Sequence, residues 1–149
     1  LEYFLKTVSK QFEVAVFTAS QKIYAETLLD FLDPDGTLIQ HRLFRDSCVC
    51  VHGNYIKDLQ VINRDLSTTM LVDNSPHAYA YNIDNGVPIE SWFDDDTDTE
   101  LLKLTGFLRK FTVEDSPDVR PIVREHFKTY KLIDRAMQGG GCPVNSPPY

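Results

Sequence analysis

The stretch Val14-Ala-Val-Phe-Thr-Ala-Ser20 decides how the rest of this 149-residue chain is interpreted. Four consecutive apolar residues lead directly into the hydroxyl side chain of Thr18. Such a run is typical of a buried parallel strand, and its polar end lies at the sheet edge where open α/β sheets bind ligands. Ser20 follows as the expected N-cap of a helix to about Leu32, with Ile23, Leu28 and Phe31 as its apolar face.

Strands and helices alternate along the chain, which predicts an α/β fold with a central parallel sheet. A second buried strand covers residues 69–72 and ends at Asp73-Asn74. Helices are expected at 1–11, from the capping box Thr97–Glu100 to about 111, and from Ser116–Pro117 to about 130. Extended segments are expected at 38–44 and 87–89, with a hairpin of 48–51 and 55–56 around His52-Gly-Asn54. We expect one domain over residues 1–136 and a flexible tail over 137–149.

The charge, hydropathy and cysteine content of the sequence argue against some classes of function. The net charge of −7, from 15 basic and 22 acidic residues, argues against general nucleic-acid binding. No run of about eighteen apolar residues is present, so no membrane span is predicted within this sequence. Three cysteines form an odd, sparse set that indicates reduced thiols and an intracellular setting, nuclear or cytoplasmic. Neither the compartment nor the oligomeric state follows more closely from the sequence.

The first residues indicate that the sequence begins partway through a longer protein. It starts at Leu1 rather than Met, and Leu1, Phe4, Leu5 and Val8 already follow helical spacing. The absence of a targeting segment therefore carries little weight.

Polar side chains follow the predicted strands at three places. Thr18 and the helix start at Ser20 together suit a phosphate, although both residues could act only as caps. Asp73 and Asn74 offer the hard oxygen ligands that Mg²⁺ prefers, although an Asx turn before Pro76 explains the pair equally well. Lys57 follows the hairpin, and one ammonium is a usual phosphate partner, but a lone lysine is more often a solvated surface group.

Three further features have competing interpretations. Arg45 could grip a phosphate with its guanidinium fork or lie on the surface. The acidic run Asp94–Asp98 directly precedes a predicted helix, and acids there complement the helix dipole without any metal. Cys48 and Cys50 alternate with valines as strand residues do, and two cysteines alone do not complete a zinc shell.

Taken in order, seven segments resemble the small phosphatases that dephosphorylate the C-terminal domain of RNA polymerase II, within the haloacid dehalogenase superfamily. The resemblance covers about residues 1–130 and is strongest to the C-terminal-domain small phosphatase-like 2 subgroup. The matching segments are Val16-Phe-Thr-Ala-Ser20, Tyr24-Ala25, Arg42-Leu-Phe-Arg45, Gly53-Asn-Tyr-Ile-Lys-Asp-Leu59, Arg64-Asp-Leu66, Val72-Asp-Asn-Ser-Pro76 and Ile89-Glu-Ser-Trp-Phe93. Asn63 stands where the family usually has Gly, a change that we expect the loop to tolerate.

The resemblance implies a Mg²⁺-dependent serine/threonine phosphoprotein phosphatase that acts through an aspartyl-phosphate. In that reaction Thr18 would hold a phosphoryl oxygen and Lys57 would neutralise charge and orient the nucleophile. Asn74 would bind Mg²⁺ directly, and Asp73 would support the metal shell. Tyr24 and Arg45 would contact the phosphopeptide.

Asp33-Pro-Asp-Gly-Thr37 matches the D-x-D-G-T signature of this superfamily letter for letter. In that signature the first Asp ends a buried strand and attacks phosphorus. Here the preceding residues 25–32 read as helix, and Pro-Asp-Gly is turn chemistry. We therefore expect Asp33 to be structural rather than catalytic.

The family's D-L-D-E-T segment, which carries the nucleophile and the general acid/base, would lie upstream of Leu1 and is not in this sequence. Its strand would lie at the sheet centre, between the Thr18 strand and the Asp73 strand. Without that strand, backbone N–H and C=O groups on both neighbouring strands would be left without hydrogen-bond partners. Each such buried group costs about 1–3 kcal/mol, so the summed cost is comparable to the free energy of unfolding of a whole domain. We therefore expect the chain alone to fold poorly or its two strands to close over the gap, and to show no turnover.

A binding function is the alternative. A chain without the nucleophile could hold phosphopeptides through Arg45 and Lys57, as a non-catalytic scaffold of the same fold like the mitochondrial matrix-import receptor. The upstream sequence discriminates: D-x-D-x-T after an apolar strand favours the enzyme, and a presequence with a membrane span favours the receptor.

Overall fold

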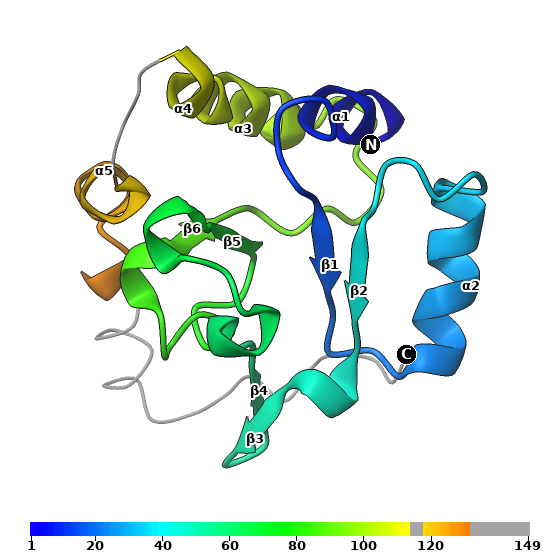
Figure 1. The fold of residues 1–149 in the computed structure, drawn as a ribbon, viewed down its shortest axis with the longest axis horizontal. Helices are drawn as coiled ribbons and strands as arrows, with labels where there is room; N and C mark the ends of the chain where they lie inside the picture. Colours follow the sequence, from blue (N-terminus) through cyan, green and yellow to red (C-terminus); the bar gives the residue numbers. More distant parts are fainter. Residues whose placement is uncertain (114–117, 132–149) are drawn as a thin grey trace. The chain divides into compact units, whose positions relative to one another are not determined.

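The computed structural model describes residues 1–113 and 118–131. The chain forms two compact units, which are described separately below and are coloured along the sequence in Figure 1. The first unit comprises Leu1–Cys48 and Ile89–Pro117, and the second comprises Val49–Pro88 and Asp118–Tyr149. Within the described ranges no helix is long and apolar enough to cross a membrane.

The first unit is built on a β–α–β segment. Strand β1 (Ala15–Phe17) pairs in parallel with β2 (His41–Leu43), in the register Val16↔Arg42. Helix α2 (Lys22–Leu32) connects them and lies beside β2 in Figure 1. Its residues Ala25 and Leu29, one turn apart, are buried with Ile39 and Phe44. This connection places the residues that follow β1 and β2 at the same sheet edge.

The prediction of which face of α2 packs in the core is wrong. The side chains of Ile23, Leu28 and Phe31 are 73, 59 and 83% exposed, whereas Ala25 and Leu29 are buried. The sheet covers only one side of the helix, and the four-residue spacing of Ala25 and Leu29 selects that side.

The rest of the first unit is helical. Helix α1 (Glu2–Val8) contacts α3 (Glu100–Leu108), and α4 (Lys110–Val113) follows. Both of the packed helices bury apolar side chains.

The second unit contains a hairpin and a second parallel pair. Strands β3 (Val49–Val51) and β4 (Asn54–Ile56) are antiparallel, and His52 and Gly53 both have positive φ in the connecting turn. This is the conformation that two-residue hairpin turns favour. Strand β5 (Leu71–Asp73) pairs in parallel with β6 (Gly86–Pro88), and α5 (Val119–Phe127) contacts β6. Short 3₁₀ turns cover Arg45–Ser47, Leu59–Ile62, Leu66–Thr68 and Ile83–Asn85.

The alternation of helices and parallel strands confirms the predicted α/β class. The described strands form three two-stranded sheets, with β1 and β5 in different ones. The expectation that the chain alone folds poorly, or that the Thr18 and Asp73 strands close over the gap, stays a prediction. Each already pairs on one side through a parallel ladder, and no other described strand joins either sheet.

Two predicted helix starts are displaced by competing side-chain hydrogen bonds. The N-cap of α2 is Gln21 and not Ser20, because the Ser20 N–H donates to Thr18 Oγ1 at 3.1 Å in a local turn. Helix α3 begins after Thr99 instead of at Thr97, because Asp95 engages both the N–H and the hydroxyl of Thr97. The carboxylate of Asp98 then accepts from the Glu100 N–H at 3.0 Å.

Helix α5 has Asp118 as its N-cap, with Asp118 Oδ1 accepting from the Arg120 N–H at 2.9 Å. It ends at Phe127, where Lys128 adopts a left-handed conformation, and residues 129–131 are helical again, close to the predicted end near 130. The predicted start at Ser116–Pro117 and the predicted tail over 137–149 lie outside the described residues.

Candidate functional site

A buried ion pair joins two of the predicted site residues in the second unit. Lys57 follows β4 and Asp73 ends β5, and the Lys57 ammonium donates to Asp73 Oδ2. Their side chains are only 13% and 8% exposed. Charges at this depth are retained only when they are paired, because water no longer solvates them. Lys57 is therefore not the solvated surface group that its isolated position in the sequence allowed.

The backbone around Asp73 fixes the carboxylate. Asp73 Oδ1 accepts from the Ser75 N–H at 2.8 Å, so the Asx turn that the sequence left open is present beside the ion pair. The Lys57 N–H donates to the Ala78 carbonyl oxygen at 2.8 Å, which ties the lysine backbone to the same turn. Asn74 lies between Asp73 and Ser75 and is exposed. One turn thus orients the lysine and the aspartate and presents an amide at the surface.

Tyr79 lies at the end of this turn and was missed by sequence reasoning. Its side chain is 1% exposed and packs with Leu59 and Leu71. Its hydroxyl has no hydrogen-bond partner among the described residues. Burial, helped by the negative charge of Asp73, raises the pKa of Tyr79 to about 12.

The ring of Tyr79 rests on Gly86 of β6. A Cβ atom at Gly86 would lie 2.5 Å from the ring, so only glycine fits beneath it. The only local signal was that Tyr79 is flanked by Ala78 and Ala80, and this spacing does not separate a core ring from a surface one.

In the first unit, the residues after β1 and β2 form a second polar group. The Thr18 N–H donates to the Leu43 carbonyl oxygen at 2.9 Å, which continues the parallel ladder past the end of β1. The Arg45 side chain donates from Nε to the Ala19 carbonyl oxygen at 2.6 Å. The Arg45 backbone N–H donates to the Ser20 carbonyl oxygen at 3.1 Å. The structure therefore places Arg45 against the Thr18–Ser20 loop and not as an isolated surface side chain.

The six predicted site residues thus fall into two groups. Lys57, Asp73 and Asn74 lie together in the second unit. Thr18 and Arg45 lie together in the first, where Tyr24, 66% exposed, belongs to the first turn of α2. The convergence of both groups on one phosphoryl group stays a prediction.

Asp33 has a structural role in this fold. It is 3% exposed and follows α2, not a strand. Its oxygens accept from the N–H groups of Thr37, Leu38 and Ile39 at 3.0, 3.0 and 2.8 Å. Burial opposes ionisation, but these three donors, aided by the charge of Arg42, lower the pKa of Asp33. Both oxygens hold the turn that leads to β2, which agrees with the expectation drawn from the sequence.

The acidic run before α3 also bonds to its own backbone. Asp95 accepts from Thr97, and Asp98 accepts from the first turn of α3. Across the described ranges, no group of three or more histidine, cysteine, aspartate or glutamate side chains is placed to hold a metal ion.

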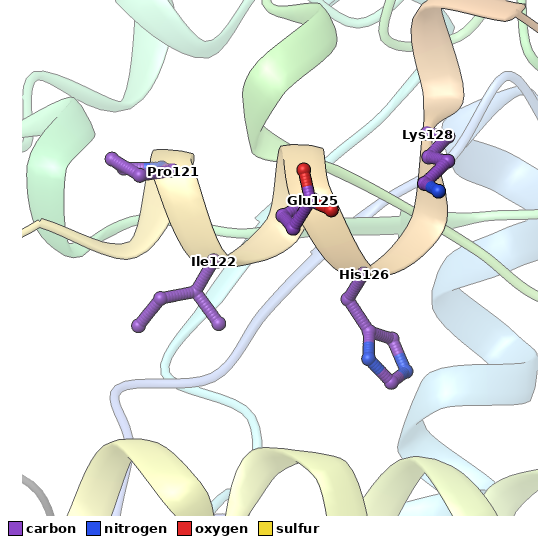
Figure 2. A pocket seen from close by; sticks show the side chains of 5 residues that line it. All are labelled: Pro121, Ile122, Glu125, His126 and Lys128. Carbon is purple, nitrogen blue, oxygen red and sulfur yellow. The ribbon is translucent and has the colours of Figure 1, made fainter.

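A shallow surface pocket lies on α5, away from the predicted residues in the sequence. It is lined by Pro121, Ile122, Glu125, His126 and Lys128. Figure 2 shows Ile122 and His126, one turn apart, pointing to the same side of the helix. None of the predicted phosphate or metal ligands lines this surface, so it does not form the candidate site.

The sequence is similar to a known protein family and to individual proteins. The family model described as "NLI interacting factor-like phosphatase" matches residues 1–120. The chain is 53% identical over 135 residues to "CTD small phosphatase-like protein 2" of Dictyostelium discoideum, covering 91% of this chain and 23% of that protein. It is 48% identical over 150 residues to "CTD small phosphatase-like protein 3" of Caenorhabditis elegans, covering 97% of this chain and 52% of that protein. The chain thus spans from about a quarter to about half the length of these relatives.

A solved structure shares the fold. The structure titled "The Structure of Fcp1, an essential RNA polymerase II CTD phosphatase" aligns with a TM-score of 0.53 at 20% identity. The alignment covers 96% of this chain and 38% of that one. At this identity the likeness establishes the haloacid-dehalogenase-like fold alone.

Proposed function

The chain belongs to the NLI interacting factor-like phosphatase family, and on that premise we propose that it forms most of a Mg²⁺-dependent phosphatase domain for phosphoserine and phosphothreonine in proteins. The observation that carries the proposal is the buried Lys57–Asp73 pair beside the exposed amide of Asn74. A buried cation held by one carboxylate at the carboxyl end of a parallel strand is suited to receive a second anion there.

Each predicted residue has a role in this proposal. The Thr18 hydroxyl holds a phosphoryl oxygen, and Lys57 neutralises the charge of the phosphoryl group. Arg45 and Tyr24 contact the phosphopeptide, and the bond from Arg45 to the Ala19 carbonyl keeps the guanidinium beside Thr18. Such positioning and charge stabilisation carry most of the catalysis in phosphoryl transfer.

The donor set at Asp73–Asn74 fits Mg²⁺ with one direct protein ligand. Both Asp73 oxygens already accept hydrogen bonds, from Ser75 and Lys57, which leaves Asp73 to orient water in the metal shell. Asn74 supplies a hard amide oxygen, and Mg²⁺ usually retains several waters. When bound, Mg²⁺ would neutralise the charge of the phosphoryl oxygens.

We assign the covalent step to a carboxylate upstream of Leu1. The reaction then consists of two in-line phosphoryl transfers through an aspartyl-phosphate, and these 149 residues alone are inactive. Asp33 does not replace that nucleophile, because its oxygens are held by three backbone donors. The substrate is a phosphoprotein, and the sparse cysteines favour an intracellular site, nuclear or cytoplasmic.

The test compares two proteins: the 149-residue chain, and the same chain extended upstream as its own transcript encodes. Release of inorganic phosphate from a phosphoserine peptide is measured with Mg²⁺ and with EDTA. We expect release only from the extended protein and only with Mg²⁺. In the extended protein, Lys57→Met abolishes release, whereas Asp33→Asn retains it.

Two outcomes would overturn parts of the proposal. Steady Mg²⁺-dependent release by the 149-residue chain would place the nucleophile inside it and return Asp33 to consideration. An extended protein that binds the phosphopeptide without releasing phosphate would favour the second candidate, a non-catalytic phosphopeptide-binding domain. That candidate rests on the same Arg45 and Lys57 cations.

A further inference from the structure

The side chain of Asn82 bonds to a distant backbone group instead of to its own turn. Asn82 is the N-cap of the 3₁₀ turn Ile83–Asn85, a position where asparagine commonly accepts from the N–H groups that follow it. Within the described residues it makes no such capping bond. Its Oδ1 atom instead accepts from the Leu59 N–H at 3.1 Å, across 23 residues of sequence. A side chain that gives up its local cap for a distant partner calls for an explanation in the tertiary structure.

The bonded amide belongs to the short segment that carries Lys57. Leu59 follows Lys57 by two residues, begins the turn Leu59–Ile62 and is buried. The Lys57 N–H is itself bonded, because it donates to the Ala78 carbonyl oxygen at 2.8 Å. The backbone is therefore anchored both before and after the Lys57 side chain.

Both anchors lie on the stretch of chain that follows Asp73. The Asp73 carboxylate accepts from the Ser75 N–H at 2.8 Å, and the Ser75 carbonyl oxygen accepts from the Ala78 N–H at 3.0 Å. The Asn82 N–H then donates to the Tyr79 carbonyl oxygen at 3.0 Å. One continuous stretch thus presents the carboxylate and holds the lysine segment at both ends.

We propose that Asn82 is a positioning residue for the candidate site: by accepting from the Leu59 N–H, its side chain fixes the segment that carries Lys57 and so holds the ammonium opposite Asp73.

The chemistry of lysine explains why a second anchor is needed. Its ammonium is carried on a flexible aliphatic stem, so the backbone must be fixed if the charge is to stay in one place. With the Ala78 bond alone, the chain beyond Lys57 could pivot, and the Asn82 bond prevents this. The Lys57 and Asp73 side chains are only 13% and 8% exposed, so a displaced ammonium would leave a buried carboxylate without its main partner. Only the anion that the fixed ammonium receives, a phosphoryl group, rests on the proposed function.

The first test follows the Lys57 ammonium protons by NMR in the full chain without ligand. A buried and paired ammonium exchanges its protons with water slowly, and a displaced one exchanges them faster. We expect Asn82→Leu, which removes the acceptor at similar size, to accelerate this exchange by about fivefold, the usual effect of one neutral hydrogen bond. Asn82→Asp keeps an acceptor oxygen and should restore slow exchange. Gln60→Leu is the matched control, because Gln60 lies next to Leu59 and is exposed.

A purely structural asparagine gives a different result. Asn82→Leu would then lower the urea midpoint and leave the exchange of the Lys57 ammonium in the folded chain unchanged, and this outcome overturns the proposal. If Asn82→Leu does not fold, the donor is removed instead. The α-hydroxy analogue of leucine at position 59 turns that amide into an ester and keeps every side chain. Wild-type exchange of the Lys57 ammonium in the ester protein likewise overturns the proposal.

The second test measures binding of inorganic phosphate to the full chain by calorimetry. We expect Asn82→Leu to weaken binding by about fivefold, because the ammonium is no longer held ready for the anion. Gln60→Leu should bind phosphate as the wild type does.

Failure of the two ideas is distinguishable. If the wild type binds phosphate and Asn82→Leu binds it equally well, the positioning role is wrong and the proposed function stands. If the wild type does not bind phosphate, the ligand assignment of the proposed function is wrong, and the exchange of the Lys57 ammonium still decides whether Asn82 positions the lysine.

Discussion

Asp33 and Asp73 are two buried aspartates with different partners. Asp33 follows a helix and accepts from three backbone N–H groups, at Thr37, Leu38 and Ile39. Asp73 ends a strand and accepts from one backbone N–H and from the Lys57 ammonium. Asp33 belongs to a letter-perfect D-x-D-G-T motif, whereas Asp73 belongs to the plainer sequence Asp-Asn-Ser-Pro.

The difference lies in what a ligand could displace. Backbone donors are fixed by the turn that they close, so a carboxylate that binds them defines structure. A lysine side chain can rotate toward an incoming anion, so a carboxylate paired with it can take part in binding. The partner of a buried aspartate therefore indicates its role better than the motif around it.

The largest expected effect comes from removing the cation. Lys57→Met leaves the Asp73 charge buried without its main partner, and such losses cost about 3–5 kcal/mol. Urea denaturation of the full chain measures the change. Lys22→Met is the control, since Lys22 is 63% exposed and lies 3.8 Å from Glu26, and it should cost less than about 1 kcal/mol. Equal losses of unfolding free energy in the two variants would show that the buried Lys57–Asp73 pair stabilises the chain no more than an exposed ion pair does.

The packing of the Tyr79 ring on Gly86 can be tested by crowding it. Gly86→Ala would push a Cβ atom to 2.5 Å from the Tyr79 ring, and overpacking of this kind costs about 1–3 kcal/mol. Gly106→Ala is the matched substitution within α3, where a new Cβ meets nothing within 4 Å. It should stabilise the chain, since alanine is the better helix former. Thermal melts with the same sign for both variants would contradict the close packing at Gly86.

Removing the other aspartate should loosen one turn locally. Asp33→Ala frees the N–H groups of Thr37, Leu38 and Ile39, so we expect their hydrogen exchange to accelerate. Asp35→Ala changes an exposed carboxylate in the same turn and leaves those bonds in place. Unchanged exchange at all three amides in Asp33→Ala would remove the structural role assigned to Asp33.

The smallest expected effect is a change in acid sensitivity. Because the pKa of Asp33 is lowered on folding, its contribution to stability is complete above the ordinary value of 3.8 and is lost as pH falls through the lower, folded value. The wild type should therefore lose stability more steeply than Asp33→Ala on acidification below about pH 4. Urea midpoints measured from pH 6 to pH 3 give both slopes, and parallel curves would refute the linkage.

The sequence was most informative where apolar runs end in polar residues. The runs before Thr18 and Asp73 located two strands of parallel pairs, because short apolar runs that end in polar residues leave few other interpretations. The predicted burial is wrong for β1, where Ala15 is exposed and Val16 and Phe17 are half-buried, because the strand has a partner on one side only. The turn chemistry of Pro34-Asp-Gly36 predicted that Asp33 does not end a strand, and Asp33 follows helix α2. Asn63, which stands where the family usually has glycine, adopts the left-handed conformation with φ of 50°, a conformation that asparagine adopts more often than most other residues.

Competition between neighbouring polar groups was not predictable. Ser20 and Thr97 both have good cap chemistry, yet Thr18 and Asp95 engage them first and the helices begin later. The local sequence shows which donors and acceptors are present, but it does not show which of them pair in the folded chain.

Tertiary packing was equally hidden from local patterns. Lys57 and Asp73 are sixteen residues apart, and nothing near either one encodes their pairing. The buried face of α2 was misassigned because Ala25 is a weaker hydrophobic signal than Ile23 or Phe31, although the sheet covers Ala25. The flanking alanines were a weak signal for Tyr79, because its burial depends on contacts with residues such as Gly86 that are distant in the sequence.

The contact between Gly86 and the Tyr79 ring has a consequence for how this domain can diverge over time. Neither position can drift alone, since any side chain at 86 collides with the ring, and loss of the ring leaves a hole above the glycine. Viable descendants should change both together, for instance alanine at 86 with leucine at 79. A lineage that made this exchange would lose the buried phenol and keep an apolar contact between the two positions.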